Sequence, residues 1–214
     1  MEIALLLFDR ITALDAVGPY EVLSRLPGAR VRWVGLRTGV HRAEHGAVGL
    51  VADHRLEDVP APDIVVLPGG VGAEAMAEDP RVLSWLRGAH ATSAITASVC
   101  TGALILAAAG LLDGVPVSSH WAYKARFEAM GLRWADQRVS RAGKIFTGAG
   151  VSAGIDLALA VASEVAGRDV AEAIQLGIEY DPKPPFDSGH PKKARPEVLE
   201  RVMARLDRTR LAGR

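Results

Sequence analysis

The residues best suited to chemistry surround the single cysteine of the chain, Cys100, in the run Ser-Val-Cys-Thr-Gly at residues 98–102. An apolar, strand-like segment at residues 94–99 leads into this run, and an apolar, helix-like segment follows it. A nucleophile on a sharp strand-to-helix turn has this context, because small residues two places before and after it let the chain turn tightly. The pattern predicts that Cys100 is a nucleophile with a strained backbone conformation.

The expected position of Cys100 also bears on its ionisation. At the carboxyl edge of a sheet and the amino end of a helix, the helix dipole and free N–H groups favour the thiolate, which is the attacking form. The alternative is inert packing, because cysteine is among the most frequently buried residue types. The turn pattern favours the reactive role. A lone cysteine also excludes an internal disulfide, which fits a reducing compartment such as the cytoplasm.

Asp15 is the candidate partner for this cysteine. It lies a few residues after the first apolar run, residues 3–8, so it belongs to the same carboxyl edge of the predicted sheet and can plausibly contact Cys100. Two roles are open to its carboxyl group. One is acid/base work, and the other is capping a helix that begins at Gly18-Pro19, where a proline is tolerated in the first turn.

Two other groups of residues are expected near this edge. Gly70 follows a second buried run within a Pro-Gly-Gly turn, although such a turn alone is more often only a tight reversal. His120 follows a further candidate strand, so its side chain can reach the edge as a residue adjacent to the site. The neighbouring Trp121 is a candidate wall for an apolar pocket, while aromatic residues at such spacing more often belong to the core.

Several classes of function are disfavoured. Lys plus Arg and Asp plus Glu both total 25, so the formal net charge is zero and no long-range field gathers nucleic acid or an anionic membrane. The apolar run at residues 103–112 is interrupted at Gly110 and is too short to span a membrane. His41 and His45 are flanked by glycines that leave too little helix for a shared metal. We therefore expect a small-molecule partner, a cytoplasmic location, and neither cofactor nor metal.

The elements that must position these residues alternate between short β-rich runs and longer helical ones, which predicts an α/β fold with a mostly parallel sheet covered on both faces. Strands are expected at residues 3–8, 64–67 and 94–99, and weaker candidates lie at 30–36, 115–118, 138–139 and 145–147. Helices are expected from Gly18-Pro19, and at residues 82–91, 101–111, 154–166 and 170–178.

The last part of the chain differs in composition. Prolines are frequent between residues 180 and 196, which predicts a long ordered loop, and an amphipathic helix is expected at about 196–210. The arginines of that helix are better explained by a solvated face than by nucleic acid. The length of 214 residues predicts a single domain over residues 1–214.

Five motifs resemble those of the ThiJ/PfpI superfamily, a flavodoxin-like group related to class I glutamine amidotransferases. They are Leu-Asp-Ala-Val-Gly-Pro at 14–19, Leu-Pro-Gly-Gly at 67–70, Ser-Val-Cys-Thr-Gly at 98–102, Ser-His-Trp-Ala-Tyr at 119–123 and Phe-Thr-Gly-Ala-Gly at 146–150. Within that superfamily, three features most resemble the bacterial isocyanide hydratases: the aspartate after the first strand, threonine directly after the cysteine, and Glu-Tyr at 179–180 followed by Pro-Pro-Phe at 184–186.

This resemblance implies a flavodoxin-like lyase that acts as a homodimer and hydrates an isocyanide to an N-formamide without cofactor or metal. It implies that Cys100 attacks the isocyanide carbon and that Asp15 shuttles protons through a covalent thioimidate. By the same resemblance, the amides of Gly70 and Thr101 line a hole beside the sulfur, and His120, Trp121 and Val151 lie at the substrate pocket.

A binding function is the alternative. Domains of this superfamily also serve as the sensing half of AraC-type transcription regulators, which can keep a similar cysteine turn. Too little chain is expected to follow the domain for a pair of helix-turn-helix units. A freestanding ligand sensor or redox-responsive protein stays open, because an exposed thiol of low pKa is easily oxidised.

Overall fold

The computed structural model describes the backbone of residues 1–211 and the side chains of residues 1–206. The chain divides into two compact units, Met1–Ile178 and Glu179–Arg214. The single domain expected over residues 1–214 stays a prediction, because this division rests on the contacts within each unit.

The first unit is built on a seven-stranded sheet in the order β5-β2-β1-β6-β7-β9-β8. All neighbouring pairs are parallel except β8 with β9. The expected α/β, flavodoxin-like class with a mostly parallel sheet is therefore confirmed. The strands are β1 (Glu2–Leu7), β2 (Arg30–Gly35), β5 (His54–Arg55), β6 (Ile64–Leu67), β7 (Ile95–Val99), β8 (Val139–Ala142) and β9 (Ile145–Gly148); β3 (Gly39–Arg42) and β4 (Gly49–Ala52) form a separate antiparallel pair.

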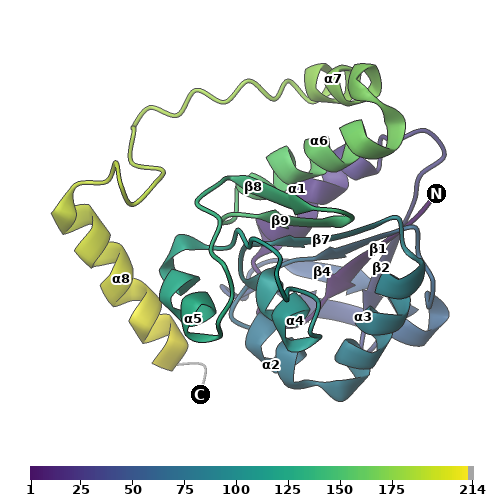
Figure 1. The fold of residues 1–214 in the computed structure, drawn as a ribbon, viewed down its shortest axis with the longest axis horizontal. Coiled ribbons are helices and arrows are strands. Elements are labelled where there is room, and N and C mark those ends of the chain that lie inside the picture. Colours follow the sequence, from purple (N-terminus) through teal and green to yellow (C-terminus); the bar gives the residue numbers. More distant parts are fainter. Residues whose placement is uncertain (212–214) are drawn as a thin grey trace. The chain divides into compact units, whose positions relative to one another are not determined.

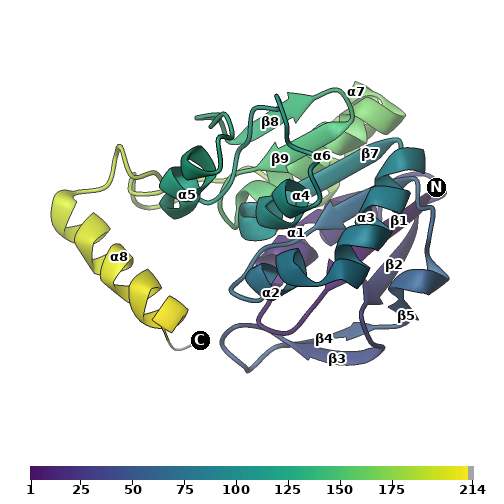
Figure 2. The same cartoon turned by 60° about the horizontal axis from the view of Figure 1, so that its bottom comes forward.

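Helices cover both faces of the sheet, as Figures 1 and 2 show. One face packs on α1 (Ala13–Leu23), α6 (Ala153–Ala166) and α7 (Arg168–Gly177), and the other on α2 (Ala73–Glu78), α3 (Pro80–Thr92), α4 (Ala103–Ala108) and α5 (Lys124–Ala129). Short 3-10 helices occur at η1 (Leu56–Asp58), η2 (Cys100–Gly102) and η3 (Trp121–Tyr123).

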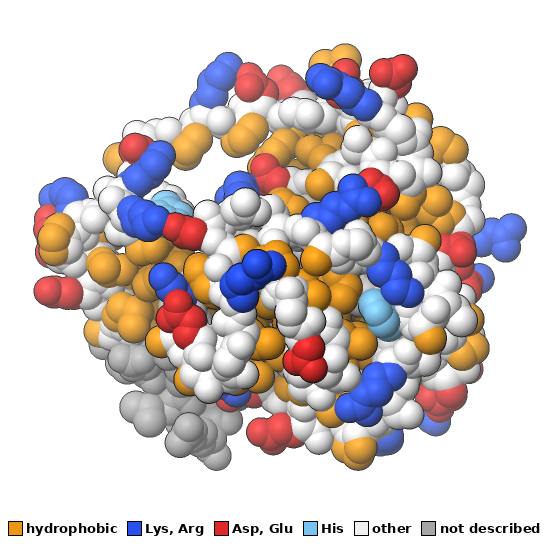
Figure 3. All heavy atoms as spheres, in the orientation of Figure 1, with side chains coloured by type: hydrophobic (Ala, Val, Ile, Leu, Met, Phe, Trp, Pro, Cys, Tyr) orange, Lys and Arg blue, Asp and Glu red, His pale blue; other side chains and the backbone are white. Residues whose placement is uncertain are grey.

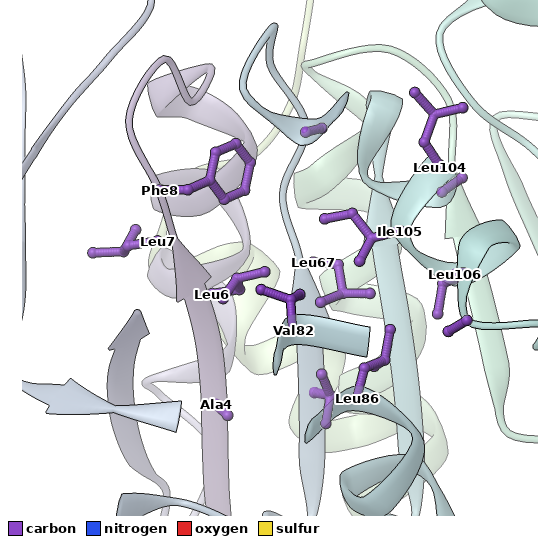
Figure 4. Close-up of a cluster of buried hydrophobic side chains, with 14 of the residues drawn as sticks. Ala4, Leu6, Leu7, Phe8, Leu67, Val82, Leu86, Leu104, Ile105 and Leu106 are labelled. Atoms are coloured by element: carbon purple, nitrogen blue, oxygen red, sulfur yellow. The ribbon is translucent and has the colours of Figure 1, made fainter. Parts of the chain in front are cut away.

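The central strands β1, β6 and β7 are buried on both faces, which explains their continuous apolar sequences. Alternate residues enter opposite cores: Leu6 and Leu67 pack with Leu86 of α3 and Ile105 of α4 (Figure 4), whereas Leu5 packs on the α1 and α6 side. This packing fixes the ends of β1, β6 and β7 side by side, so the loops that follow them meet at one edge.

The helix expected to begin at Gly18-Pro19 begins instead at Ala13, and Pro19 lies inside α1. Both residues lie against α6: a Cβ on Gly18 would come within 3.3 Å of Ile155, and a Cβ on Gly154 within 3.1 Å of Pro19. The dipeptide therefore marks a close approach of two helices rather than a helix start. As a result, Asp15 lies within the first turn of α1 and not before the helix.

One further expectation about strands is wrong, and one pair of strands was not predicted. Residues 115–118 form only an isolated bridge between Val117 and Trp134, and Pro116 among them has no N–H to donate to a sheet. The β3–β4 hairpin, whose strands are only four residues long, was not predicted from the sequence.

In the second unit, residues 180–195 contain neither helix nor strand, and α8 (Pro196–Leu211) follows them. The expected apolar face of this helix, Leu199, Val202, Met203 and Leu206, lies within the described side chains, whereas Arg208 of its polar face lies outside them.

Candidate active site

Cys100 lies at the turn between β7 and η2 with a backbone φ of 55°. This left-handed conformation is strained for any residue except glycine, at a typical cost of about 1–3 kcal/mol, so the expected strain is confirmed. Two hydrogen bonds support it: the Cys100 N–H donates to the Ala149 carbonyl (2.9 Å), and the Cys100 carbonyl accepts from Ser119 Oγ (2.6 Å).

Gly102 lets the turn pack directly on the end of β6. A Cβ at this position would lie 2.1 Å from the Leu67 carbonyl oxygen and 2.8 Å from that of Pro68. Both obstacles are backbone atoms of a buried segment and cannot rotate away. The requirement for a small residue two places after the cysteine therefore has a direct steric cause.

The structure brings Asp15 and Cys100 together from α1 and η2. Asp15 is fully buried, and its Oδ2 accepts a hydrogen bond from the Gly69 N–H (2.9 Å). The thiol is close enough for each side chain to shift the pKa of the other. Asp15 Oδ1 is buried and has no hydrogen-bond partner among the described residues, so one oxygen of the carboxyl group is left unpaired.

Burial dominates the ionisation of both groups. Burial raises the pKa of Asp15 to about 7. The hydrogen bonds from Gly69 and Cys100 lower this pKa, whereas the negative charge of Glu44 raises it further. Burial also raises the pKa of the Cys100 thiol well above its ordinary value, and the nearby Asp15 carboxylate raises it further.

The expected stabilisation of the thiolate is thus only partly present. The backbone amides of Val151 and Thr101 do lower the pKa of Cys100 through hydrogen bonds to its sulfur, but burial outweighs them because Cys100 is only 4 % exposed. The resting site is therefore a neutral thiol beside a carboxyl group that changes charge near neutral pH. A thiol in this state needs a base before it can attack.

The expected role of the Gly70 amide beside the sulfur stays a prediction. Its N–H donates to Thr101 Oγ1 (2.8 Å), and the Thr101 hydroxyl donates to the Gly70 carbonyl (3.1 Å), so this amide is already satisfied. The backbone amides that lower the pKa of the Cys100 thiol are those of Thr101 and Val151, while the hole that Thr101 is expected to line stays a prediction. Gly70 also contributes its backbone conformation, with a φ of 129° that residues with side chains rarely adopt.

His120 and Trp121 lie beside the turn that carries Val151. The half-buried His120 ring stacks on Trp121, with 5.4 Å between the ring centroids, and a Cβ on Gly150 would lie 2.9 Å from His120 Cδ2. His120 Nδ1 also accepts from the Ala122 N–H (3.3 Å) at the start of η3. The structure therefore places His120 next to the site, while the assignment of these residues to the substrate pocket stays a prediction.

Three contributors to the site were not identified from the sequence. Gly69 supplies the amide that binds Asp15, and a Cβ there would lie 2.6 Å from the Thr101 nitrogen and 2.8 Å from Asp15 Oδ2. Ser119 supports the Cys100 carbonyl, and Glu44 acts on Asp15 from the missed β3–β4 hairpin. Gly69 and Ser119 stand in motifs that the sequence shows, but no role was assigned to either, whereas Glu44 belongs to no motif.

The molecular surface in Figure 3 agrees with the charge balance of the sequence. Acidic and basic side chains are interspersed on the face drawn in Figure 3. Among the described residues, there is no cluster of three His, Cys, Asp or Glu side chains that could bind a metal ion. None of the helices in that same part of the chain is both long and apolar enough to cross a membrane.

Comparison with known proteins places this site in a family context. Residues 1–164 match the DJ-1/PfpI family. The chain is 40% identical to an isonitrile hydratase of Pseudomonas putida over 96% of its own length and 90% of the relative. A crystal structure of a ThiJ/PfpI family protein from Pseudomonas syringae superposes with a TM-score of 0.92 at 32% identity, covering 99% of this chain and 88% of that one.

A regulator is also among the relatives. The chain is 29% identical to the HTH-type transcriptional regulator GbdR of Pseudomonas aeruginosa over 84% of its own length, but it spans only 50% of that protein. The similarity therefore covers about half of the regulator.

Proposed function

This chain belongs to the DJ-1/PfpI family, and from that premise we propose that it is a lyase that hydrates a small isocyanide to an N-formamide. One observation carries the proposal: the strained Cys100 and the buried Asp15 meet at one edge of the sheet, and the carboxyl group has a pKa of about 7. The likeness to an isonitrile hydratase over nearly the whole chain supports the choice of substrate class. The proposal includes a homodimer in the cytoplasm.

The first half of the reaction joins the sulfur to the isocyanide carbon. Because the pKa of Cys100 is raised, the ionised Asp15 takes the thiol proton as the sulfur attacks. Asp15 then delivers the same proton to the carbon, which gives the thioimidate R–N=CH–S–Cys100. One S–H bond breaks, and one S–C and one C–H bond form, so no other reagent is consumed.

Water completes the reaction. Asp15 takes a proton from water as the oxygen adds to the thioimidate carbon, and the nitrogen is protonated. The C–S bond of the adduct R–NH–CH(OH)–S–Cys100 then breaks as its O–H proton passes through Asp15 to the leaving sulfur, which releases R–NH–CHO and restores the thiol. The amides of Val151 and Thr101, which lower the pKa of Cys100, stabilise the sulfur as it leaves with negative charge.

The test follows both product and intermediate. An aryl isocyanide labelled with ¹³C at the terminal carbon is incubated with the protein, and formamide is measured by ¹³C NMR. An acid quench followed by mass spectrometry is expected to find the added mass of the isocyanide on the peptide that contains Cys100. Formamide production that continues in Cys100→Ala would sink the proposed mechanism.

The acid limb of the pH profile is expected near the pKa of Asp15. The ionised carboxylate is the active base, so kcat/KM is present above about pH 7 and is lost as the pH falls through that value. The loss approaches tenfold per pH unit once Asp15 is protonated. Measuring kcat/KM between pH 5 and pH 9 checks this, and a flat profile through pH 7 is the contrary result.

A freestanding sensor is the second candidate, favoured by the likeness to half of a transcription regulator. In that case the parent protein produces no formamide. Dilute peroxide would instead convert Cys100 to sulfenic or sulfinic acid, which intact-mass measurement detects as added oxygen. This oxidation requires the site to open, because the thiol is buried and its pKa is raised rather than lowered.

A further inference from the structure

Glu44 lies on the β3–β4 hairpin but is tied to the loop that leads into α1. Its N–H donates to the Ile11 carbonyl (2.9 Å), and Ile11 also forms bridges with Ala43 and with Gly70. The turn that carries Glu44 is therefore connected through one residue to the Gly69-Gly70 turn of the site. These backbone contacts fix the position of Glu44 relative to the site, so this position does not depend on the Glu44 side chain alone.

Thr12 links the Glu44 carboxylate to Asp15. The Thr12 hydroxyl donates to Glu44 Oε2 (3.2 Å), the Thr12 carbonyl accepts from the Asp15 N–H (3.0 Å), and the Thr12 N–H donates to the Gly69 carbonyl (2.9 Å). Thr12 is also the residue that precedes α1. One residue thus contacts the Glu44 carboxylate, the Asp15 backbone and the residue that binds the Asp15 carboxyl group.

We propose that Glu44 is a positioning residue for the reaction: its carboxylate, bound by Thr12 beside the first turn of α1, makes Asp15 a stronger base toward the Cys100 thiol. The effect of Glu44 on turnover rests on the proposed function. The electrostatic coupling between Glu44 and Asp15 is independent of that function, because it exists in the free protein.

The charges around Asp15 support this role. The titratable groups that act on its carboxyl group are the Cys100 thiol from η2 and Glu44 from the hairpin, while Gly69 contributes a neutral amide. A second negative charge near a buried carboxyl group disfavours its ionised form. The Glu44 side chain is only 23 % exposed, so water screens this repulsion less than at an open surface.

One neighbour can weaken the effect. His45 Nε2 lies 3.5 Å from Glu44 Oε1, and its side chain is 68 % exposed. When this imidazole is protonated, it partly neutralises Glu44. The experiment is therefore done in parallel in the parent and in a His45→Gln background, which retains Glu44 without the imidazole.

The test measures the titration of Asp15 directly. Protein labelled with ¹³C at aspartate carboxyl groups is titrated by NMR, and Asp15→Asn identifies the resonance of residue 15. Glu44→Gln is expected to lower the Asp15 midpoint, and Glu44→Asp to retain most of the parent value. Glu128→Gln is the matched control, because Glu128 is 51 % exposed on α5 and lies 3.8 Å from Lys124, so its loss should leave the midpoint unchanged.

A second variant separates charge from local disruption. Thr12→Val keeps the Glu44 charge but removes its hydroxyl donor, and the midpoint is expected to fall between those of the parent and Glu44→Gln. In turnover, the acid limb of kcat/KM should move to lower pH in Glu44→Gln, together with the NMR midpoint. An unchanged Asp15 midpoint in folded Glu44→Gln overturns the inference, whereas a shifted midpoint in a protein without hydratase activity rejects only the proposed function.

Discussion

Replacing Asp15 by asparagine is expected to lower isocyanide turnover by roughly 10²–10⁴-fold, the range supplied by a positioned acid/base group. Cys100 keeps its place in this variant, but no carboxylate takes its proton as the sulfur attacks. The acid limb near pH 7 should disappear as well, because it belongs to the lost group. Formamide production by Asp15→Asn and by Cys100→Ala, measured beside the parent, gives the size of the loss.

The same substitution should make the thiol more reactive toward a simple reagent. The negative charge of Asp15 raises the pKa of Cys100, so its removal lowers the pH at which the thiolate forms. Iodoacetamide reports on this change without ambiguity, because Cys100 is the only cysteine of the chain. We expect the midpoint of alkylation to move to lower pH in Asp15→Asn while hydration is lost.

Stability provides the control for this experiment. The pKa of Asp15 in the folded protein, about 7, lies above its ordinary value of 3.8, so ionisation of Asp15 opposes folding. The contribution that the protonated Asp15 makes to the free energy of unfolding is fully present below about pH 4. It is lost as the pH rises through about 7. Asparagine does not ionise, so at pH 8 the variant should melt no lower than the parent. Slower alkylation, or a large loss of stability at pH 8, would contradict this account of the site.

The meeting of Asp15 and Cys100 could be predicted from the parallel sheet. Parallel strands of one sheet have their carboxyl ends at the same edge, and the apolar runs before Asp15 and Cys100 are long enough to be recognised as β1 and β7, which lie on either side of β6. The strained turn at Cys100 could be predicted for a similar reason, since small residues at fixed spacing leave few other conformations.

The ionisation of the site could not be predicted in this way. The helix-end amides that favour the thiolate are local and visible in the sequence, whereas the burial that outweighs them depends on how several elements close over Cys100. Likewise, Gly69 and Gly70 are equivalent in the sequence, and only the contacts with Asp15 and Thr101 show which amide binds which group.

Errors in the helices and hairpin have a related origin. Gly18-Pro19 carries a strong local signal for a helix start, but its packing against Gly154 and Ile155 of α6 decides its place within α1. Glu44 was missed because β3 and β4 are too short to be recognised as strands. A charge that acts through space on Asp15 leaves no pattern along the chain.

Replacing Gly102 by alanine is expected to destabilise the fold more than any change at the surface. The new Cβ would lie 2.1 Å from the Leu67 carbonyl oxygen, so either η2 or the end of β6 must move. Overpacking of a well-packed interior typically costs about 1–3 kcal/mol, and contact with two backbone carbonyls places this site at the upper end or beyond. For a chain of this size, such a loss corresponds to a fall in Tm of roughly 5–10 °C, which calorimetry measures.

Gly88→Ala is the matched control for Gly102→Ala, because Gly88 lies within α3 and, apart from its chain neighbours and the adjacent helix backbone, no atom lies within 4 Å of an added Cβ. Alanine is favoured over glycine inside a helix by about 0.5–1 kcal/mol, so this variant should melt slightly higher than the parent. The two changes add the same methyl group with opposite expected signs. A Gly102→Ala variant that melts at the same temperature as the parent would contradict the close packing of η2 on β6. A variant that melts lower but whose Cys100 is alkylated at the parent rate would show that the strain at residue 102 does not reach the sulfur.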